Sequence, residues 1–288
     1  MDYVGQIIRP PSEANSIILQ VTVGCSHNKC TFCGAYKEKR FSIKDDATVD
    51  ADIQFASQYC RKQHKVFLAD GDALILPFPR LIRIFKRIKQ DMPWVRRVSL
   101  YGSARSIRSK TSEQLSVLKE LGLDRVYLGL ESGSDTILSK VNKGETAQSM
   151  IQAAQHIKQA GLFLSVTVLL GLAEVAGSEN HAIETGKVLS KMMPNQIAAL
   201  TLMVLENTEL GKAYSRGEFQ IPHAYEMLSE LKVLVEHIDT SAQFHANHAS
   251  NYLPIMGRLP RDKEKILALI HEAQSGARQL VPEGLRRL

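Results

Sequence analysis

The feature that most constrains the fold of this chain is a regular alternation of short apolar runs and helical patterns. Strand-like runs occupy residues 17–23, 65–68, 97–100, 125–130, 163–169 and 198–205. Several of them, such as VTVLLGL, are apolar throughout, which is expected when both faces of a parallel strand are covered. Helical patterns separate most of the runs, for example at 146–160, where Gly161 is expected to cap the C-terminus. Six strand–helix repeats predict an α/β fold, a partial (β/α)6 TIM-like barrel.

The rhythm changes after about residue 212. Helical patterns are expected at 222–237 and 261–275, with the polar segment FHANHASNY at 244–252 between them. No long Gly/Ser-rich linker precedes this part of the chain. The sequence therefore predicts a core barrel at 1–212 and a mainly helical C-terminal extension at 213–288 that packs on the barrel.

Polar residues and glycines follow the ends of five predicted strands. In a parallel barrel the chemistry lies at the carboxyl ends of the strands, so these segments are the candidate site. They are Gly24-Cys25, Asp70-Gly71-Asp72, Gly102-Ser103-Ala104-Arg105, Glu131-Ser132-Gly133 and Gly171-Leu172-Ala173-Glu174.

Three of the four cysteines lie in one short loop, TVGCSHNKCTFCGAY, with the spacing C-x4-C-x2-C. In a reducing compartment such a group indicates metal ligation before disulfides. Thiolates favour an iron–sulfur cluster or zinc. Three thiolates leave one iron of a cubane cluster open, whereas a structural zinc site needs a fourth ligand, which His27 would have to supply from within the loop.

This loop resembles that of the radical S-adenosylmethionine (SAM) superfamily, whose members carry three cysteines after the first barrel strand. Their usual spacing is C-x3-C-x2-C, with an aromatic residue before the last cysteine, and Phe32 occupies that place here. The extra residue between Cys25 and Cys30 departs from the usual spacing. The resemblance covers about residues 16–205. It implies an oxygen-sensitive 4Fe–4S cluster on Cys25, Cys30 and Cys33, with SAM as the second cofactor.

The resemblance extends to two further strand ends. Asp70-Gly71-Asp72 stands where the family has a Gly-Gly-Glu-like turn that receives the SAM amino group, because carbonyls and carboxylates accept from an ammonium. Glu131 matches an acidic or amide residue that faces SAM, and Lys143 matches a later basic residue that reaches the SAM carboxylate. The alternative for both is a cap or an ion pair at the surface.

Other matches concern the third and fifth strands. Ser103 and Arg105 stand at polar positions after strand three, although Arg105 also suits a structural ion pair. VTVLLGLAE resembles the strand-five motif that lines the adenine, which implicates Thr167, Gly171 and Leu172. The alternatives are a buried strand residue for Thr167 and a tight turn for Gly171.

In this family the cluster reductively cleaves SAM to methionine and a 5′-deoxyadenosyl radical, which abstracts hydrogen from the substrate. The resemblance thus implies a radical SAM enzyme served by a one-electron donor such as flavodoxin or ferredoxin. The barrel is similar to the coproporphyrinogen dehydrogenase-like branch. Alanine occupies the position two residues after Cys33, where those enzymes usually carry another cysteine, so their specific activity is not expected.

The polar segment 244–252 holds the candidate substrate-facing residues His245, Asn247, His248 and Asn251. Densely placed hydrogen-bonding groups are costly to bury without partners, and histidine transfers protons near neutral pH. We therefore expect His245 and His248 to act catalytically on a small organic substrate, with a solvated loop as the alternative.

The charge and hydropathy of the chain indicate which partners, nucleic acid or membrane, are expected. The net charge of +6 favours solubility over RNA binding, which leaves a tRNA- or RNA-modifying radical SAM enzyme as one alternative and a non-catalytic iron–sulfur or zinc-binding protein as another. One basic run is predicted to form the wet face of an amphipathic helix: Arg80, Arg83, Lys86, Arg87 and Lys89. The chain shows neither an apolar run of about 20 residues nor a secretory signal pattern, so a cytoplasmic protein without membrane contact is expected.

Overall fold

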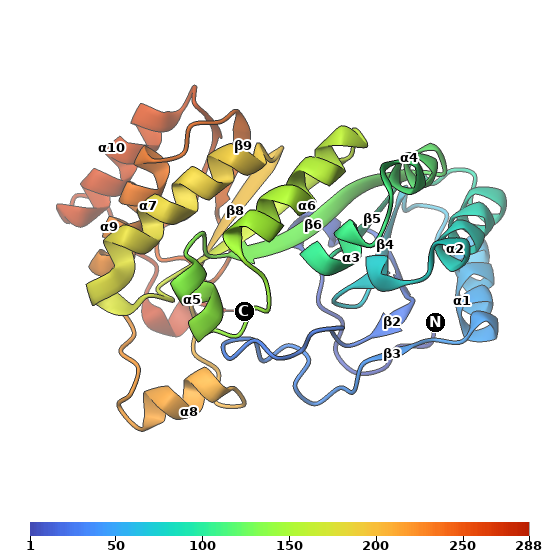
Figure 1. Ribbon diagram of the computed structural model, residues 1–288, viewed down its shortest axis with the longest axis horizontal. Coiled ribbons are helices and arrows are strands. Elements are labelled where there is room, and N and C mark those ends of the chain that lie inside the picture. The colour runs from blue at the N-terminus through green and yellow to red at the C-terminus, as the bar shows by residue number, and fades with distance from the viewer. Residues whose placement is uncertain (288) are drawn as a thin grey trace. The chain divides into compact units, whose positions relative to one another are not determined.

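A computed structural model describes residues 1–287 (Figure 1). They divide into two compact units. The first unit comprises residues 1–28, 35–128 and 155–164. The second comprises 29–34, 129–154 and the described chain from 165 onward. Strands β6 (Leu123–Glu131) and β7 (Phe163–Leu170) and helix α6 (Ala147–Gln159) each have residues in both units.

The first unit is built on parallel strands. β1 (Ile17–Gln20), β4 (Lys65–Ala69) and β5 (Arg97–Tyr101) lie side by side in that order, followed by β6. Ile17 pairs with Val66, and Val66 pairs with Val98. A small antiparallel pair is formed by β2 (Thr22–Val23) and β3 (Ser42–Ile43).

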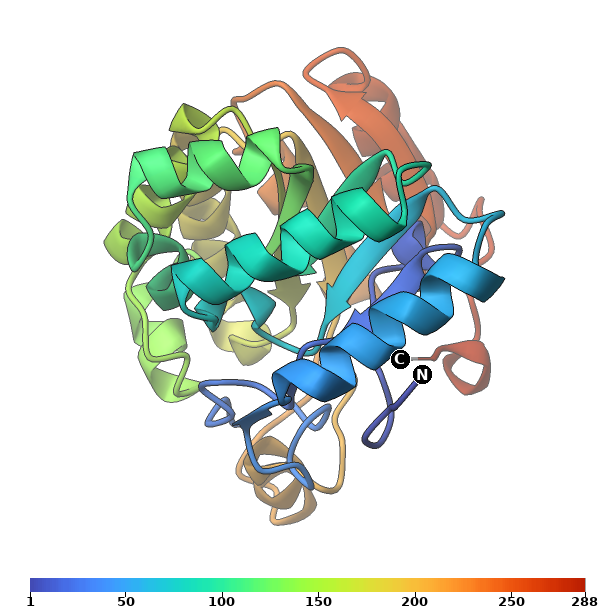
Figure 2. The ribbon, with the colours of Figure 1, turned by 90° about the vertical axis from the view of Figure 1, so that its right-hand side faces the viewer.

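Helices of the first unit pack over these strands. They are η1 (Pro11–Glu13), α1 (Asp46–Tyr59), η2 (Ala73–Ile75), α2 (Phe78–Asp91), α3 (Ala104–Arg108) and α4 (Ser112–Glu120). Figure 2 shows α1, α2 and α4 side by side in front of the strands. Two of these helices have N-terminal caps. At the start of α1 the Asp45 side chain accepts from the Thr48 N–H at 2.8 Å, and at the start of α4 Thr111 forms a capping box with Gln114.

Helix α2 confirms the predicted amphipathic pattern, with Leu81, Ile84, Phe85 and Ile88 buried. Its three arginines pair with acidic residues. Arg80 contacts Asp46 at 2.7 Å, Arg83 pairs with Asp50, and Arg87 pairs with Asp91 at 2.8 Å. These ion pairs neutralise much of the charge that a phosphate-rich partner would need from this helix.

The second unit contains parallel strands and one antiparallel edge. β7 pairs with β8 (Gln196–Thr201), β8 pairs in parallel with β9 (Ala242–Ala246), and β9 pairs antiparallel with β10 (Ile255–Leu259). Its remaining elements are α5 (Asp135–Lys140), α7 (Glu174–Met192), α8 (Glu209–Ser215), α9 (Ala224–Glu236), α10 (Lys263–Gln274) and η3 (Glu283–Leu285). Helix α9 packs between α7 and α10 (Figure 1).

Several sequence predictions meet the structure here. The α/β class is confirmed, because mostly parallel strands alternate with helices. Gly161, at φ +66°, ends the predicted helix α6. The residues after 212 contribute two strands in addition to helices, and the first of them, β9, includes Phe244-His245-Ala246 of the polar segment. The division at residue 212 stays a prediction.

No helix within residues 1–287 combines the length and the apolar composition that a membrane crossing requires.

Candidate functional site

The first part of the cysteine loop is attached to the end of β4. The N–H of Gly24 donates to Asp70 Oδ2 at 3.1 Å, and its carbonyl accepts from the Gly71 N–H at 3.1 Å. Gly24 has φ +75°, a conformation that glycine adopts without strain. These bonds fix the backbone immediately before Cys25 beside the predicted Asp70-Gly71-Asp72 turn.

The second part of the loop, residues 29–34, is held within the second unit. The N–H of Thr31 donates to the Val141 carbonyl, and the Thr31 carbonyl accepts from the Leu210 N–H, both at 2.9 Å. A Cβ on Gly34 would lie 2.5 Å from Asn207 Oδ1, so only glycine fits there without a shift. The segment carrying Cys30, Phe32 and Cys33 is thus anchored at the end of α5 and the start of α8, and all three side chains are partly buried.

All four cysteines are thiols and each is partly buried, so the loop offers three sulfur donors without a competing disulfide. Within the described residues, no three His, Cys, Asp or Glu side chains are already grouped as a metal site. The donor chemistry nevertheless fits an iron–sulfur cluster. The backbone of Gly71 lies close to Cys25 and Tyr36. A Cβ at this position would lie 3.2 Å from the Cys25 Cβ and 2.7 Å from the Tyr36 ring.

Asp72 is completely buried, and its carboxylate is satisfied within the protein. It accepts from Ser26 Oγ at 2.5 Å, Ser103 N at 3.0 Å, Ser103 Oγ at 2.9 Å and Ser106 Oγ at 2.6 Å. Ser103 also caps α3 by accepting from the Ser106 N–H. Burial lowers the pKa of nearby Lys110, and the charge of Asp72 opposes that shift. Asp72 and Ser103 therefore hold the start of α3 through these hydrogen bonds.

Asp70 differs from Asp72 because one of its oxygens is unsatisfied. Oδ2 accepts from Gln20 Nε2 and Lys39 Nζ, each at 3.2 Å, in addition to the Gly24 N–H. Oδ1 is buried and has no hydrogen-bond partner among the described residues. A buried acceptor without a partner costs about 1–3 kcal/mol, so this oxygen marks a place where a ligand donor would be stabilising.

Tyr36 is a residue of this region that the sequence prediction missed. Tyr36 is 6% exposed, and its hydroxyl lies close to the Asp70 carboxylate without a well-formed hydrogen bond to any group within residues 1–287. Burial, followed by the negative charge of Asp70, raises the pKa of Tyr36 far above its ordinary range, so the hydroxyl keeps its proton. The only sequence signal was its position three residues after Cys33.

Glu131 and Lys143 are brought together as an ion pair. Lys143 Nζ lies 2.9 Å from Glu131 Oε1, and the two side chains are 16% and 14% exposed. Glu131 has φ +65° at the end of β6, an uncommon conformation for a residue with a side chain. A Cβ on Gly129 would fall 2.2 Å from Glu131 Oε1, so this glycine makes room for the pair.

Arg105 is exposed on α3, and no ion pair with it is found in the described part of the chain. The structural ion pair that its sequence position suggested is therefore not observed. Its guanidinium is accessible to a ligand or solvent.

Thr167 lies within β7, and Gly171 and Leu172 follow the end of that strand. Thr167 is partly exposed between the buried Val166 and Val168, whereas Leu172 is buried. Gly171 has φ +89°, as the predicted tight turn requires, and its N–H donates to Glu230 on α9.

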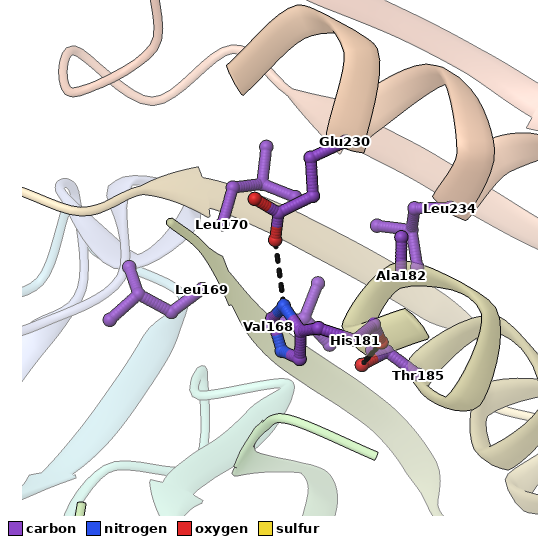
Figure 3. Close-up of a pocket in the computed structure, with 8 residues that line it drawn as sticks. All are labelled: Val168, Leu169, Leu170, His181, Ala182, Thr185, Glu230 and Leu234. Atoms are coloured by element: carbon purple, nitrogen blue, oxygen red, sulfur yellow. Dashed lines mark hydrogen bonds and ion pairs between the residues drawn. The ribbon is translucent and has the colours of Figure 1, made fainter. Parts of the chain in front are cut away.

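The sequence prediction also missed the polar pair behind this turn. Figure 3 shows His181 and Glu230 pointing toward one another, with His181 Nδ1 at 2.7 Å from Glu230 Oε1. Both lie on helices at positions that local periodicity assigns to the core, so no sequence signal distinguished them.

The polar segment 244–252 begins in strand β9 and continues as a loop after Ala246. His245 lies on β9, with Nδ1 at 2.9 Å from Gln196 Nε2. His248 contacts the backbone and side chain of Ser250, and burial lowers its pKa. Asn251 is buried and bonds to Thr201 Oγ1 at 2.8 Å, which makes it a structural link to β8. Asn247 is exposed.

Comparisons with known proteins agree on one family. Residues 19–181, more than half of the chain, match the radical SAM superfamily. The tRNA uridine(34) acetyltransferase of Methanocaldococcus infernus is 30% identical over 117 residues, 38% of this chain and 21% of that protein. The chain thus matches about a fifth of the length of that relative.

Two solved structures have similar folds. Coproporphyrinogen III oxidase (HemN) from Escherichia coli superposes with a TM-score of 0.55 at 14% identity, covering 77% of this chain and 53% of that chain. The radical SAM methyltransferase TsrM from Kitasatospora setae gives 0.61 at 13% identity, covering 90% and 61%. These likenesses confirm the predicted TIM-like α/β fold.

Proposed function

Because this chain belongs to the radical SAM superfamily, we propose that it cleaves SAM reductively at a 4Fe–4S cluster to a 5′-deoxyadenosyl radical that abstracts hydrogen from a small organic substrate. Membership makes the protein an enzyme whose cofactors are that cluster and SAM. It argues against a non-catalytic zinc or iron–sulfur protein.

Within this proposal Cys25, Cys30 and Cys33 bind the cluster as thiolates. Gly24 and Thr31 hold the two parts of their loop through backbone hydrogen bonds, so the loop has a defined attachment in each unit. The main support for SAM binding at this loop is Asp70 Oδ1, a buried carboxylate oxygen without a hydrogen-bond partner among the described residues. Asp70 is next to Gly71, the glycine that lies close to Cys25. An ammonium such as the SAM amino group would satisfy Asp70 Oδ1.

Other residues of the chain orient SAM. Lys143 is a cation that pairs with Glu131, and a SAM carboxylate would compete for it. Arg105 offers a second accessible cation. Thr167 and the backbone of the Gly171-Leu172 turn would contact the adenine.

His245 and His248 are proposed to move protons on the substrate. The lowered pKa of His248 keeps its ring neutral near pH 7, as a proton acceptor requires. Electrons for SAM cleavage would come from a one-electron donor of the flavodoxin or ferredoxin class.

The first test is an anaerobic assay of SAM cleavage. The cluster is reconstituted, reductant and SAM are added, and 5′-deoxyadenosine is quantified for the wild type and for Cys30→Ala. We expect product from the wild type and none from the variant. Cys60→Ala is the matched control, since Cys60 lies outside the loop at the end of α1. Product from Cys30→Ala, or none from wild-type protein with a full cluster, would refute the proposal.

RNA modification is the second candidate function. The observation that favours it is the similarity to a tRNA uridine(34) acetyltransferase. Neutralisation of the α2 arginines by Asp46, Asp50 and Asp91 argues against that helix as an RNA surface. Binding of tRNA that weakens steeply with salt would favour this candidate over a small substrate.

A further inference from the structure

A buried histidine–glutamate pair lies behind the carboxyl end of β7. His181 is on α7 and Glu230 is on α9, and their side chains are 3% and 0% exposed (Figure 3). His181 Nε2 is buried and has no hydrogen-bond partner within residues 1–287. The surrounding side chains include Val168, Leu170 and Leu234, and the space between them has no room for a water molecule. The pair therefore interacts in a dry, apolar setting.

Glu230 also holds the backbone of the turn that follows β7. The Gly171 N–H donates to both carboxylate oxygens, at 3.0 Å to Oε2 and 3.2 Å to Oε1. A Cβ on Gly171 would lie 2.4 Å from Met227 Cε, also on α9. Helix α9 thus contacts this turn through a hydrogen bond and through close packing.

The hydrogen bonds assign the donors. Both oxygens of Glu230 accept from the Gly171 N–H, and Oε1 is also 2.7 Å from His181 Nδ1. A carboxylate with His181 Nδ1–H as donor satisfies all these contacts. His181 therefore orients the carboxylate toward Gly171.

Burying such a polar pair between helices and a strand costs free energy. Buried charges lose their hydration, and apolar residues of similar volume often stabilise a core at least as well. What a charged acceptor adds is a directional hydrogen bond to one backbone N–H in a medium of low dielectric constant, where such a bond is strengthened. The arrangement specifies the conformation of Gly171 more tightly than apolar packing would.

The two faces of β7 separate this pair from the proposed adenine side. Successive side chains of a strand point to opposite faces, so Val168 and Leu170 face the pair, whereas Thr167 and Leu169 face away and are partly exposed. In Figure 3, Leu169 lies apart from the His181–Glu230 contact. Glu230 therefore acts on the turn from the side opposite to Thr167.

We propose that Glu230, oriented by His181, is a positioning residue that holds the Gly171-Leu172 turn in the conformation that receives the adenosyl part of SAM. Helix α9, in the part of the chain beyond the family match, thereby sets the affinity of the enzyme for SAM. This inference rests on the proposed function.

The test compares Glu230→Leu with Glu230→Gln in reconstituted protein. Iron content, the dissociation constant for SAM and amide hydrogen exchange in the peptide around Gly171 are measured. Leucine removes the acceptor, so we expect faster exchange and a SAM dissociation constant raised at least about tenfold, with iron content unchanged. Glutamine keeps an oxygen for the Gly171 N–H, and its amide N–H can donate to His181 Nδ1 once the neutral ring carries its proton on Nε2, so it should restore most of the affinity.

Glu236→Leu is the matched control, because Glu236 is an exposed glutamate on the same helix, 39% exposed and 3.9 Å from Lys232. It should leave SAM binding and exchange unchanged. Faster exchange in Glu230→Leu with unaltered SAM affinity would overturn the proposal and leave a purely structural pair. If Glu230→Leu does not fold, His181→Gln replaces it, and unaltered SAM affinity with faster exchange again overturns the proposal.

Failure of the proposed function would look different. Wild-type protein with a full cluster would then not bind SAM at all, while the exchange difference between Glu230→Leu and Glu230→Gln would persist.

Discussion

Replacing Asp72 by alanine should destabilise the protein because its carboxylate is the common acceptor of a buried network. Four hydrogen bonds from Ser26, Ser103 and Ser106 end on it, and the side chain is completely buried. This network predicts a structural role for Asp72, while the SAM contact that its sequence position suggests stays a prediction.

The size of the effect follows from which donors find new partners. Ser106 Oγ already lies 3.0 Å from the Ser103 carbonyl, which can accept its hydrogen bond. Ser103 Oγ still accepts from the Ser106 N–H, but its own O–H loses the Asp72 acceptor. The Ser26 hydroxyl, the Ser103 hydroxyl and the Ser103 N–H would be left without an acceptor, at a cost of about 1–3 kcal/mol each, toward the lower value where water reaches the partly buried serines. Including the charged character of the lost bonds, we expect the free energy of unfolding to fall by about 3–5 kcal/mol. Asp72→Asn keeps one acceptor oxygen and should cost about half as much.

Urea unfolding of the cluster-free protein, followed by circular dichroism, measures this difference. Asp124→Ala is the matched control, since Asp124 is exposed and lies 3.5 Å from Arg97, so it should change stability by less than about 1 kcal/mol. If Asp72→Ala were as stable as the control while its SAM affinity fell, the buried network would be refuted. Asp72 would then return to the set of ligand-facing residues.

Two further predictions concern the first unit. Tyr127 has its pKa raised to about 12 by burial and by a hydrogen bond to a buried glutamate, whereas an unfolded tyrosine titrates near 10. The contribution of Tyr127 to the free energy of unfolding is therefore complete below pH 10 and is lost as the pH rises toward 12. Between these pH values the free energy of unfolding of Tyr127→Phe should fall by about 2 kcal/mol less than that of the wild type, as measured by unfolding at alkaline pH. An identical alkaline loss would contradict this. Gly71→Ala places a methyl 2.7 Å from the Tyr36 ring and 3.2 Å from the Cys25 Cβ, so iron content after reconstitution should fall and stability should drop by about 1–3 kcal/mol. Gly284→Ala, with open space around it, is the control, and full iron loading of Gly71→Ala would count against the close approach.

Local patterns in the sequence were enough to predict most elements of the fold. Hydrophobic periodicity located the parallel strands and the amphipathic helix α2, because burial of one face follows the geometry of the element itself. The three-cysteine loop predicted the family, which residues 19–181 match. Gly161 was identifiable as a helix end because its conformation is a local requirement.

The tertiary structure decided which residues meet. Periodicity does not separate a polar strand from a loop, so β9, which includes His245, was not foreseen. Asp70 and Asp72 look equivalent in the sequence, yet three serines satisfy one carboxylate while an oxygen of the other lacks a partner among the described residues. His181 and Glu230 are 49 residues apart and meet only because α7 and α9 pack together. Element type is set by nearest neighbours along the chain, but the partner of a buried polar group is set by packing between distant segments, which no local pattern records.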